Sequence, residues 1–328
     1  MRAFIHAVLL VTLYGVEAAA GAVATLGFGV VPTESAVGLR RDYEVLRADL
    51  ESALGQPVKM VFAPDYTGVI EAMRFGQIHL GVFGNNAAID AVDRAGGEVF
   101  SQQIDKDGNP GYWSVILVHR DSPIDTLDLL IARRSELTFA MGDPQSTSGT
   151  LVPGTYAFAK HGVNPAREFK ASRRSHHEAN VLSVANRQID ACTANNETLF
   201  RLEQRMPAMA LQVKVIWKSP LIAMDALILK RDLPAETQAR LRSFFAHYGD
   251  TPEQRTAIAA LKLSGFRTSS NDQLIPYRLM RLQRERTLIE ADDRLTADSR
   301  TEKLAAVATA MAALESGGGT FLAPPGAP

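Results

Sequence analysis

Three consecutive hydroxyl-bearing residues, Ser146, Thr147 and Ser148, are the strongest candidates for chemistry in this sequence. They follow a predicted buried strand at 137–141 and a Gly-Asp-Pro turn, and an apolar run at 151–159 comes after them, so we expect strand, turn and helix in that order. The first turn of a helix carries unpaired backbone N–H groups and a partial positive charge. Hydroxyls beside those amides would form a neutral cradle for a tetrahedral oxyanion. The simpler interpretation is that one of the three only caps the helix.

An enzyme is the main alternative, with Ser146 or Ser148 as nucleophile and His177 and Asp225 as its partners in a triad. The serines lack the preceding glycine of the G-x-S-x-G turn found in hydrolases. The run that starts at His177 ends in Val181 where the H-E-x-x-H zinc pattern needs a histidine. Neither a cysteine pair nor a carboxylate cluster has metal-ligand spacing in the sequence. The sequence therefore favours binding over catalysis, without metal or cofactor.

The elements that must position these groups alternate between strand and helix in the N-terminal part of the chain. Strands are predicted at 25–31, 58–62 and 78–83. This alternation is typical of an α/β lobe with a mostly parallel sheet, and such sheets bind ligands beyond the carboxyl ends of their strands. The loops that hold Thr33, Tyr66 and Asn85 are therefore candidate walls of a site.

A second strand–helix series begins near residue 126 and predicts a second lobe. We expect the strand at 226–229 to pair with the strand at 112–118, so that the chain crosses between the lobes near residues 119 and 225. The tail ends in glycine and proline runs, a composition that stays disordered. The predicted division is a signal peptide at 1–24, lobe 1 at 25–119 and 225–290, lobe 2 at 120–224, and a C-terminal helix with a disordered tail at 291–328.

The N-terminus and the composition indicate an exported protein. Arg2 precedes an apolar run at 7–16 that is too short to cross a bilayer, and small residues follow, with cleavage expected after Ala20 or Ala24. The single cysteine, Cys192, cannot form an internal disulfide, which a chain of this length does not need. A formal net charge of −1 gives no electrostatic footprint for nucleic acid. We expect the mature protein in the periplasm.

Six short segments, taken together and in order, match one known family. They are residues 62–66, 110–115, 142–149, 151–154, 177–180 and 215–222. By these segments the chain resembles the periplasmic phosphonate-binding proteins of ABC transporters over residues 26–281. The resemblance implies an α/β fold of the type II, Venus-flytrap class, in which two lobes joined by two crossover strands close on a ligand and a helical tail follows. It also implies a membrane permease as partner.

The resemblance assigns the phosphonate end of the site to the hydroxyl run at 146–148. Tyr66 would donate its phenol from the opposite lobe, and His177 would add a ring N–H. Because His176 is adjacent, the choice between the two histidines stays open. A tetrahedral oxyanion accepts several hydrogen bonds, and charge-assisted bonds are roughly twice as strong as neutral ones.

The same matching places two carboxylates, Glu197 and Asp225, where they would receive an ammonium group, with Tyr112 closing the side of the pocket. Three features depart from the family pattern. Phe83 replaces a common aromatic hydroxyl, and the pair Asn85–Asn86 differs as well. The third is the run that starts with the pair Arg173–Arg174, where an extra arginine near the mouth of the site could favour a ligand with a second anionic group.

The expected function is capture of phosphonates, above all 2-aminoethylphosphonate, for an ABC importer. The alternatives are a receptor for phosphite, phosphate or another small oxyanion, presentation of the ligand to a membrane sensor, and a secreted hydrolase that uses Ser146 and His177. The Ala-rich stretch at 301–314 is a candidate contact for a homodimer, which its pattern alone does not decide.

Overall fold

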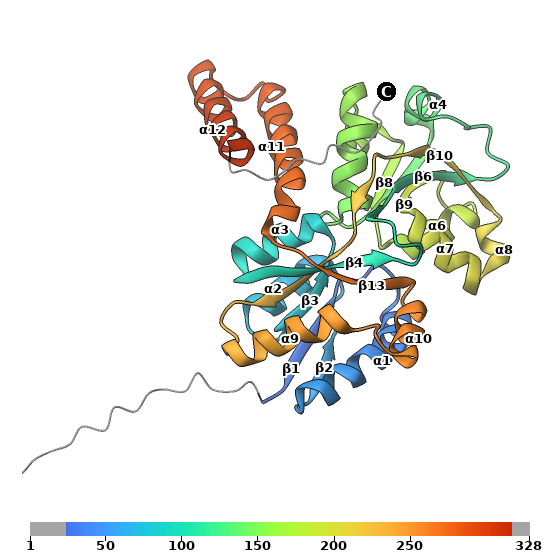
Figure 1. Ribbon diagram of the computed structural model, residues 1–328. Helices are drawn as coiled ribbons and strands as arrows, with labels where there is room; N and C mark the ends of the chain where they lie inside the picture. The colour runs from blue at the N-terminus through green and yellow to red at the C-terminus, as the bar shows by residue number, and fades with distance from the viewer. Residues whose placement is uncertain (1–23, 317–328) are drawn as a thin grey trace, which may run out of the picture.

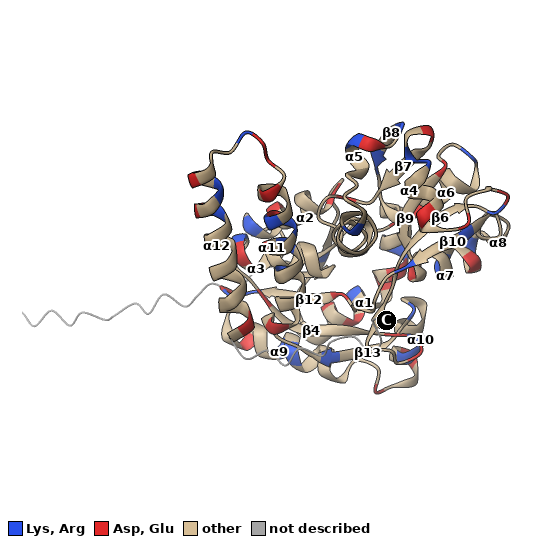
Figure 2. Ribbon diagram, turned by 90° about the horizontal axis from the view of Figure 1, so that it is seen from above, with Lys and Arg blue, Asp and Glu red and all other residues tan. Residues whose placement is uncertain are grey.

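The structure is a computed structural model that describes residues 24–316. The predicted signal peptide, apart from Ala24, and the end of the predicted tail lie outside the described residues. The fold has two α/β lobes, each built on its own sheet (Figure 1), followed by two C-terminal helices. This is the two-lobed type II architecture that the sequence predicts. Acidic and basic residues are mixed over both lobes (Figure 2).

The first lobe is organised by a six-stranded sheet in the order β13-β4-β12-β3-β1-β2. Its strands are β1 (Leu26–Val30), β2 (Val58–Val61), β3 (Leu80–Phe83), β4 (Gly97–Asp105), β12 (Ala226–Lys230) and β13 (Leu263–Thr268). Its helices are α1 (Ala36–Leu54), α2 (Tyr66–Arg74), α3 (Asn85–Arg94), α9 (Ala235–His247) and α10 (Pro252–Ala260). Helix α1 begins because the Ser35 hydroxyl caps the Gly38 N–H, and it ends at Gly55 in a left-handed conformation. Its apolar residues recur at helical spacing and are buried against the sheet.

The second lobe contains a five-stranded sheet in the order β10-β6-β9-β7-β8. Its strands are β6 (Ser114–His119), β7 (Thr138–Met141), β8 (Ala171–Arg174), β9 (Ala191–Asn195) and β10 (Val213–Lys218). Its α-helices are α4 (Leu127–Ala132), α5 (Pro165–Glu168), α6 (His177–Ala185), α7 (Asn196–Arg205) and α8 (Pro207–Ala210). Successive side chains of β6 enter two different cores, because strand side chains alternate between the faces of a sheet.

The prediction that the strand at 226–229 pairs with the strand at 112–118 is wrong. Strand β12 lies antiparallel between β3 and β4 in the first lobe, whereas β6 lies between β9 and β10 in the second. Both strands are buried along their whole length, so their apolar patterns carry no information about a partner. Both sheets are also mixed rather than mostly parallel.

The chain passes between the lobes twice, and the two passages lie side by side. Because β4 and β6 belong to different sheets, the first passage lies between Asp105 and Ser114 rather than near the predicted residue 119. The second lies between Lys218 and Ala226. Short strands within the two passages, β5 (Gly111–Tyr112) and β11 (Ile222–Ala223), pair antiparallel and form a two-stranded ribbon.

The C-terminal helices α11 (Ile275–Glu290) and α12 (Ala297–Ser316) pack on each other. The start of α11 lies beside α3 of the first lobe, and α12 stands farther out (Figure 1). Among residues 24–316, none of the helices is both long and apolar enough to cross a membrane.

The ribbon between the lobes predicts that Gly111→Ala destabilises the protein. A Cβ at this position would lie 2.1 Å from the carbonyl oxygen of Ile222, which is backbone and cannot step aside. We expect the free energy of unfolding to fall by about 1–3 kcal/mol or more, measured by denaturant titration. Gly154→Ala is the matched control, because its nearest neighbour is the end of a flexible arginine at 3.8 Å. Equal stability of the two variants would contradict a tight ribbon.

Candidate ligand-binding site

The hydroxyl run begins a short π-helix, Thr147–Leu151, at the end of β7. Its first turn is fixed by Ser146, whose side chain caps the helix and accepts the Gly149 N–H at 2.9 Å. In the π register the carbonyl of Ser148 would need a donor at Pro153, which has no N–H. The buried hydroxyl of Ser114 in β6 takes that place and donates to the Ser148 oxygen at 2.6 Å.

The carbonyl of Gly149 is also held from outside the helix. It accepts from the Gly142 N–H at 3.0 Å and from the Thr193 hydroxyl at 2.7 Å. A Cβ at Gly142 would lie 2.6 Å from the Gly149 Cα, so glycine is needed where β7 ends and the helix begins. The capping interpretation and the site interpretation therefore both apply to this run, and the backbone beneath it is fixed by residues of β6 and β9.

His177 lies against the hydroxyl run, and His176 does not. The Nε2 of His177 is 3.2 Å from the Ser146 hydroxyl and 3.5 Å from the Ser148 hydroxyl. The ring of His176 instead caps α6 by accepting the Ala179 N–H. Burial, together with the smaller effect of the positive charge of Arg201, lowers the pKa of His177 to about 3. The imidazole is therefore neutral at pH 7.

Two buried phenols complete this end of the pocket. Tyr66 is the first residue of α2 in lobe 1, and Tyr112 lies in β5 of the ribbon. Burial raises the pKa of both phenols, although hydrogen bonds with Ser146 and Ser148 oppose the shift. Both groups therefore keep their protons at pH 7 and can donate them in hydrogen bonds.

The hydroxyl of Thr147 connects the lobes. It accepts the backbone N–H of Asn86, in the first turn of α3, at 2.8 Å. A second bond across the cleft joins the Tyr66 N–H to the Asp143 carboxylate at 3.3 Å. The structure thus has the two lobes in contact around the hydroxyl run. The pair Asn85–Asn86, which departs from the family pattern, contributes a backbone donor to this contact.

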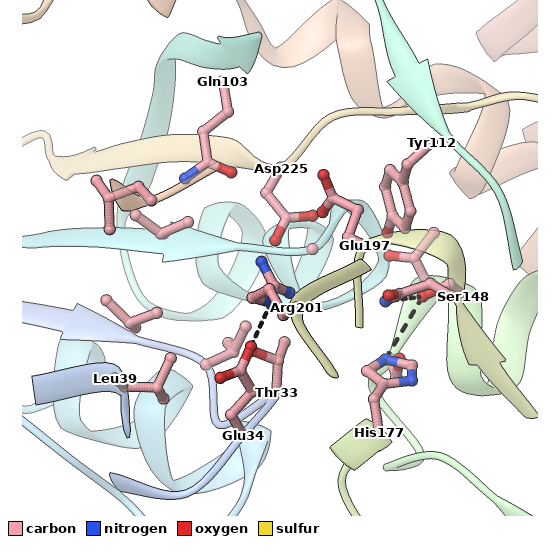
Figure 3. A pocket seen from close by; sticks show the side chains of 18 of the residues that line it. Thr33, Glu34, Leu39, Gln103, Tyr112, Ser148, His177, Glu197, Arg201 and Asp225 are labelled. Atoms are coloured by element: carbon pink, nitrogen blue, oxygen red, sulfur yellow. Dashed lines mark hydrogen bonds and ion pairs between the residues drawn. The ribbon is translucent and has the colours of Figure 1, made fainter. Parts of the chain in front are cut away.

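Glu197 and Asp225 lie next to each other in the pocket, with Glu197 beside Tyr112 (Figure 3). Glu197 stands in the first turn of α7, which Asn195 caps, and Asp225 directly precedes β12. Burial raises the pKa of Asp225 to about 7; the charge of Glu197 adds to the shift and that of Arg201 opposes it. Burial raises the pKa of Glu197 as well. Because ionising both neighbouring acids is unfavourable, a cation bound between them would be stabilised.

Arg201 is the main charged residue of the site that the sequence did not indicate. It lies one helical turn after Glu197 on α7, lines the pocket and forms an ion pair with Glu34 of lobe 1. Arg205, one turn further, pairs with Glu34 and with Asp42. Burial works against the charge of Arg201, but Glu34 and Glu197 outweigh it and raise the pKa of the guanidinium. The i, i+4 spacing in the sequence predicts that these two arginines share one face of a helix. The residues near them in the sequence give no sign of a partner on the other lobe.

All eight residues singled out in the sequence line one pocket between the lobes. They are Tyr66, Tyr112, Ser146, Thr147, Ser148, His177, Glu197 and Asp225. The pocket also includes Thr33, Glu34, Tyr43, Gln103, Asn195 and Arg201. Within residues 24–316, no three His, Cys, Asp or Glu side chains are arranged to hold a metal ion.

Two of the departures from the family pattern, Phe83 and the pair Arg173–Arg174, do not line the pocket. Phe83 is fully buried in the core of lobe 1. Arg174 supports the hydroxyl run from behind, where it donates to the Gly142 carbonyl and to the Thr150 hydroxyl, each at 3.1 Å. Arg173 lies on the exposed strand β8. The hypothesis that this pair acts at the mouth of the site is therefore wrong.

The proximity of the two acids predicts that Glu197→Gln lowers the pKa of Asp225. Removing the neighbouring negative charge leaves burial as the main cause of the upward shift. A pH titration of the Asp225 carboxyl carbon by NMR measures this pKa directly. Glu178→Gln is a suitable control, since that carboxylate faces the Ser35 N–H and not the pocket. An unchanged value in Glu197→Gln would show that the two acids do not interact.

Residues 28–274 match the family described as the periplasmic substrate-binding protein of the phosphonate ABC transporter. The chain is 43% identical over 278 residues to the phosphonates-binding periplasmic protein of Escherichia coli, covering 85% of this chain and 82% of that protein. It is 30% identical over 235 residues to the phosphate-import protein of Mycolicibacterium smegmatis, covering 68% of this chain and 71% of the relative.

A crystal structure with the same fold is that of a binding protein component of an ABC phosphonate transporter from Pseudomonas aeruginosa. It superposes with a TM-score of 0.87 at 44% identity and covers 89% of this chain and 96% of its own. These descriptions name binding or import proteins and not enzymes, as the sequence predicts. The chain therefore belongs to the periplasmic substrate-binding proteins of phosphonate ABC transporters.

Proposed function

We propose that this protein captures 2-aminoethylphosphonate in the cleft between its lobes and delivers it to a membrane permease. The observation that carries the proposal is that one pocket holds two chemically different sets of groups. Neutral hydrogen-bond donors lie around the hydroxyl run, and two buried acids, Glu197 and Asp225, line the same pocket beside them (Figure 3). A phosphonate with an amino group on a short chain matches both sets at once.

The phosphonate would be held by hydroxyls, phenols and an imidazole. Ser146, Ser148, Tyr66, Tyr112 and His177 all line the pocket. Hydrogen bonds to an anion are stronger than bonds between neutral groups, and a dry pocket strengthens them further. Donors from both lobes and from the ribbon would meet on one anionic group, so the ligand would favour the form in which the lobes are closed.

The ammonium group would lie between Glu197 and Asp225. Without a ligand, burial and, to a smaller extent, the charge of Glu197 raise the pKa of Asp225 to about 7. A cation between the two carboxylates would relieve that repulsion and favour both ionised forms. Phosphate and phosphite carry a similar negative charge but bring no cation to the two acids. This is the physical reason to favour an aminoalkyl phosphonate over phosphate or phosphite.

The remaining parts of the assignment follow the family. We infer that residues 1–24 are a signal peptide, cleaved after Ala20 or Ala24, and that the mature protein works in the periplasm. A homodimer contact through α12 stays a prediction. Among the residues of that helix, Val307 is buried and most of the others are exposed.

The ammonium assignment predicts a ligand-dependent effect of Glu197→Gln and Asp225→Asn. Each variant should weaken binding of 2-aminoethylphosphonate by about thirtyfold or more, because it removes one partner of a buried charge pair. Binding of methylphosphonate, which has no ammonium group, should change by less than about threefold. Calorimetric titration of both ligands measures the difference. Equal losses for the two ligands would contradict the assignment.

The cradle assignment predicts that Ser148→Ala weakens both ligands alike, by about tenfold or more, since a hydrogen bond to a charged group is lost. Ser148 is the sharpest choice of the three, because Ser146 also caps the helix and Thr147 also binds the Asn86 N–H. Thr155→Ala is the control: its hydroxyl bonds to the Leu151 carbonyl nearby and does not line the pocket.

Titration with phosphate in parallel tests the alternative that the M. smegmatis relative suggests. Phosphate binding as tight as that of 2-aminoethylphosphonate would favour the alternative.

A further inference from the structure

Arg281, on helix α11, makes four hydrogen bonds beside the hydroxyl run without lining the pocket. Its Nε and Nη2 donate to the side-chain and backbone oxygens of Asn86, each at 2.6 Å. Its Nη1 donates to the Asp90 carboxylate at 2.7 Å, and its Nη2 also reaches the side-chain oxygen of Gln145 at 3.0 Å. Basic positions of α11 lie beside acidic positions of α3 (Figure 2).

Gln145 completes this array from the second lobe. Its carboxamide oxygen accepts from Arg281, and its Nε2 donates to the second oxygen of Asp90 at 2.7 Å. The same carboxamide thus accepts a hydrogen bond from the arginine and donates one to the carboxylate of one ion pair. Gln145 directly precedes Ser146, whereas Asp90 belongs to α3 of lobe 1. These two bonds therefore join the lobes next to the hydroxyl run.

The residue that Arg281 holds most closely, Asn86, is also the one that meets the site. Its N–H donates to the Thr147 hydroxyl at 2.8 Å while Arg281 occupies its two oxygens. One turn before Arg281, near the start of α11, the Tyr277 hydroxyl accepts the Ala223 N–H of the ribbon at 2.8 Å. The first half of α11 thus contacts both the passage between the lobes and the edge of the hydroxyl run.

We propose that Arg281 is a positioning residue for ligand capture, which couples α11 to closure of the lobes through Gln145. Its bonds to Asn86 and Asp90 lie within one side of the cleft, and the second N–H of Nη2 donates to Gln145 of lobe 2. When the lobes close, Gln145 adds its two hydrogen bonds to an ion pair that is already formed. These two bonds favour the closed form and with it the bound ligand. The inference rests on the proposed function, because it assumes that the hydroxyl run holds the ligand.

Two variants test this role and keep a positive charge beside the Asp90 carboxylate. Gln145→Ala removes the contacts across the cleft and leaves the bonds of Arg281 to Asn86 and Asp90 in place. Arg281→Lys keeps the positive charge near Asp90 but loses the fork of donors. Arg281→Ala is avoided, because it would leave the Asp90 carboxylate buried without its partner.

Arg278→Ala is the matched control. Arg278 lies one turn earlier on α11 and forms a two-bond ion pair with Asp93 of the same helix α3, at 2.6 Å for each bond. Among the described residues its hydrogen bonds stay within this side of the cleft. It therefore controls for the loss of an α11–α3 ion pair as such.

We expect Gln145→Ala and Arg281→Lys to weaken 2-aminoethylphosphonate and methylphosphonate to the same extent, by about 5- to 50-fold. Arg278→Ala should stay within about twofold of the parent protein. Faster ligand dissociation should accompany the loss, with the melting temperature of the ligand-free variants close to that of the parent. Small-angle scattering should show a smaller ligand-induced compaction at equal ligand concentration.

Three results would overturn the inference: parental affinity in both test variants, an equal loss in Arg278→Ala, or a loss fully matched by a lower melting temperature without ligand. Ser148→Ala distinguishes this failure from failure of the proposed function. If Ser148→Ala loses affinity while Gln145→Ala does not, the inference on Arg281 alone is wrong. If Ser148→Ala also binds like the parent protein, the hydroxyl run does not hold the ligand and the proposed function fails with it.

Discussion

The missing N–H of Pro153 is the constraint on which the geometry of the site depends. A helix that starts at Thr147 would have no backbone donor for the Ser148 carbonyl in the π register, and a buried carbonyl needs one. The Ser114 hydroxyl supplies it from β6, and Thr193 of β9 does the same for Gly149. The loop that presents the hydroxyls is thereby bonded to the two central strands of its lobe. Because hydroxyls of β6 and β9 donate to the buried carbonyls of this loop, its side chains can face the cleft.

The two lobes contribute differently to the pocket. Lobe 2 supplies the rigid hydroxyl run, His177 and Glu197, whereas lobe 1 supplies Tyr66 and Asp225. Neither set of groups in the pocket is complete on one lobe alone. Ion pairs of Glu34 and hydrogen bonds beside the hydroxyl run join the same two lobes. A ligand that contacts residues of both lobes in this pocket would therefore also hold the lobes together.

Features that depend on neighbouring residues could be predicted from the sequence, whereas features that depend on residues far apart in the chain could not. The order of strand, turn and helix around Ser146 is local, and so its role at a helix start could be predicted. The partners of β6 and β12 could not, because strands buried on both faces look alike in sequence. Arg201 escaped notice for a related reason. An arginine on a polar helix predicts a solvated surface, and its partner Glu34 lies on the other lobe, where no spacing rule reaches.

The neutral chemistry around the hydroxyl run has a consequence for the kinetics of encounter. The proposed phosphonate site has hydroxyls, phenols and a neutral imidazole as donors. The rest of the pocket lining has four acids and one base, Arg201, and the whole chain carries a formal charge of −1. Electrostatic steering of an anionic ligand needs a positive field that extends beyond the surface, and dipoles of hydroxyls and amides act only at contact. Ligands should therefore reach this cleft by unguided diffusion, at a rate that dissolved salt hardly alters. Such a receptor would select by what it holds after contact rather than by what it attracts from a distance.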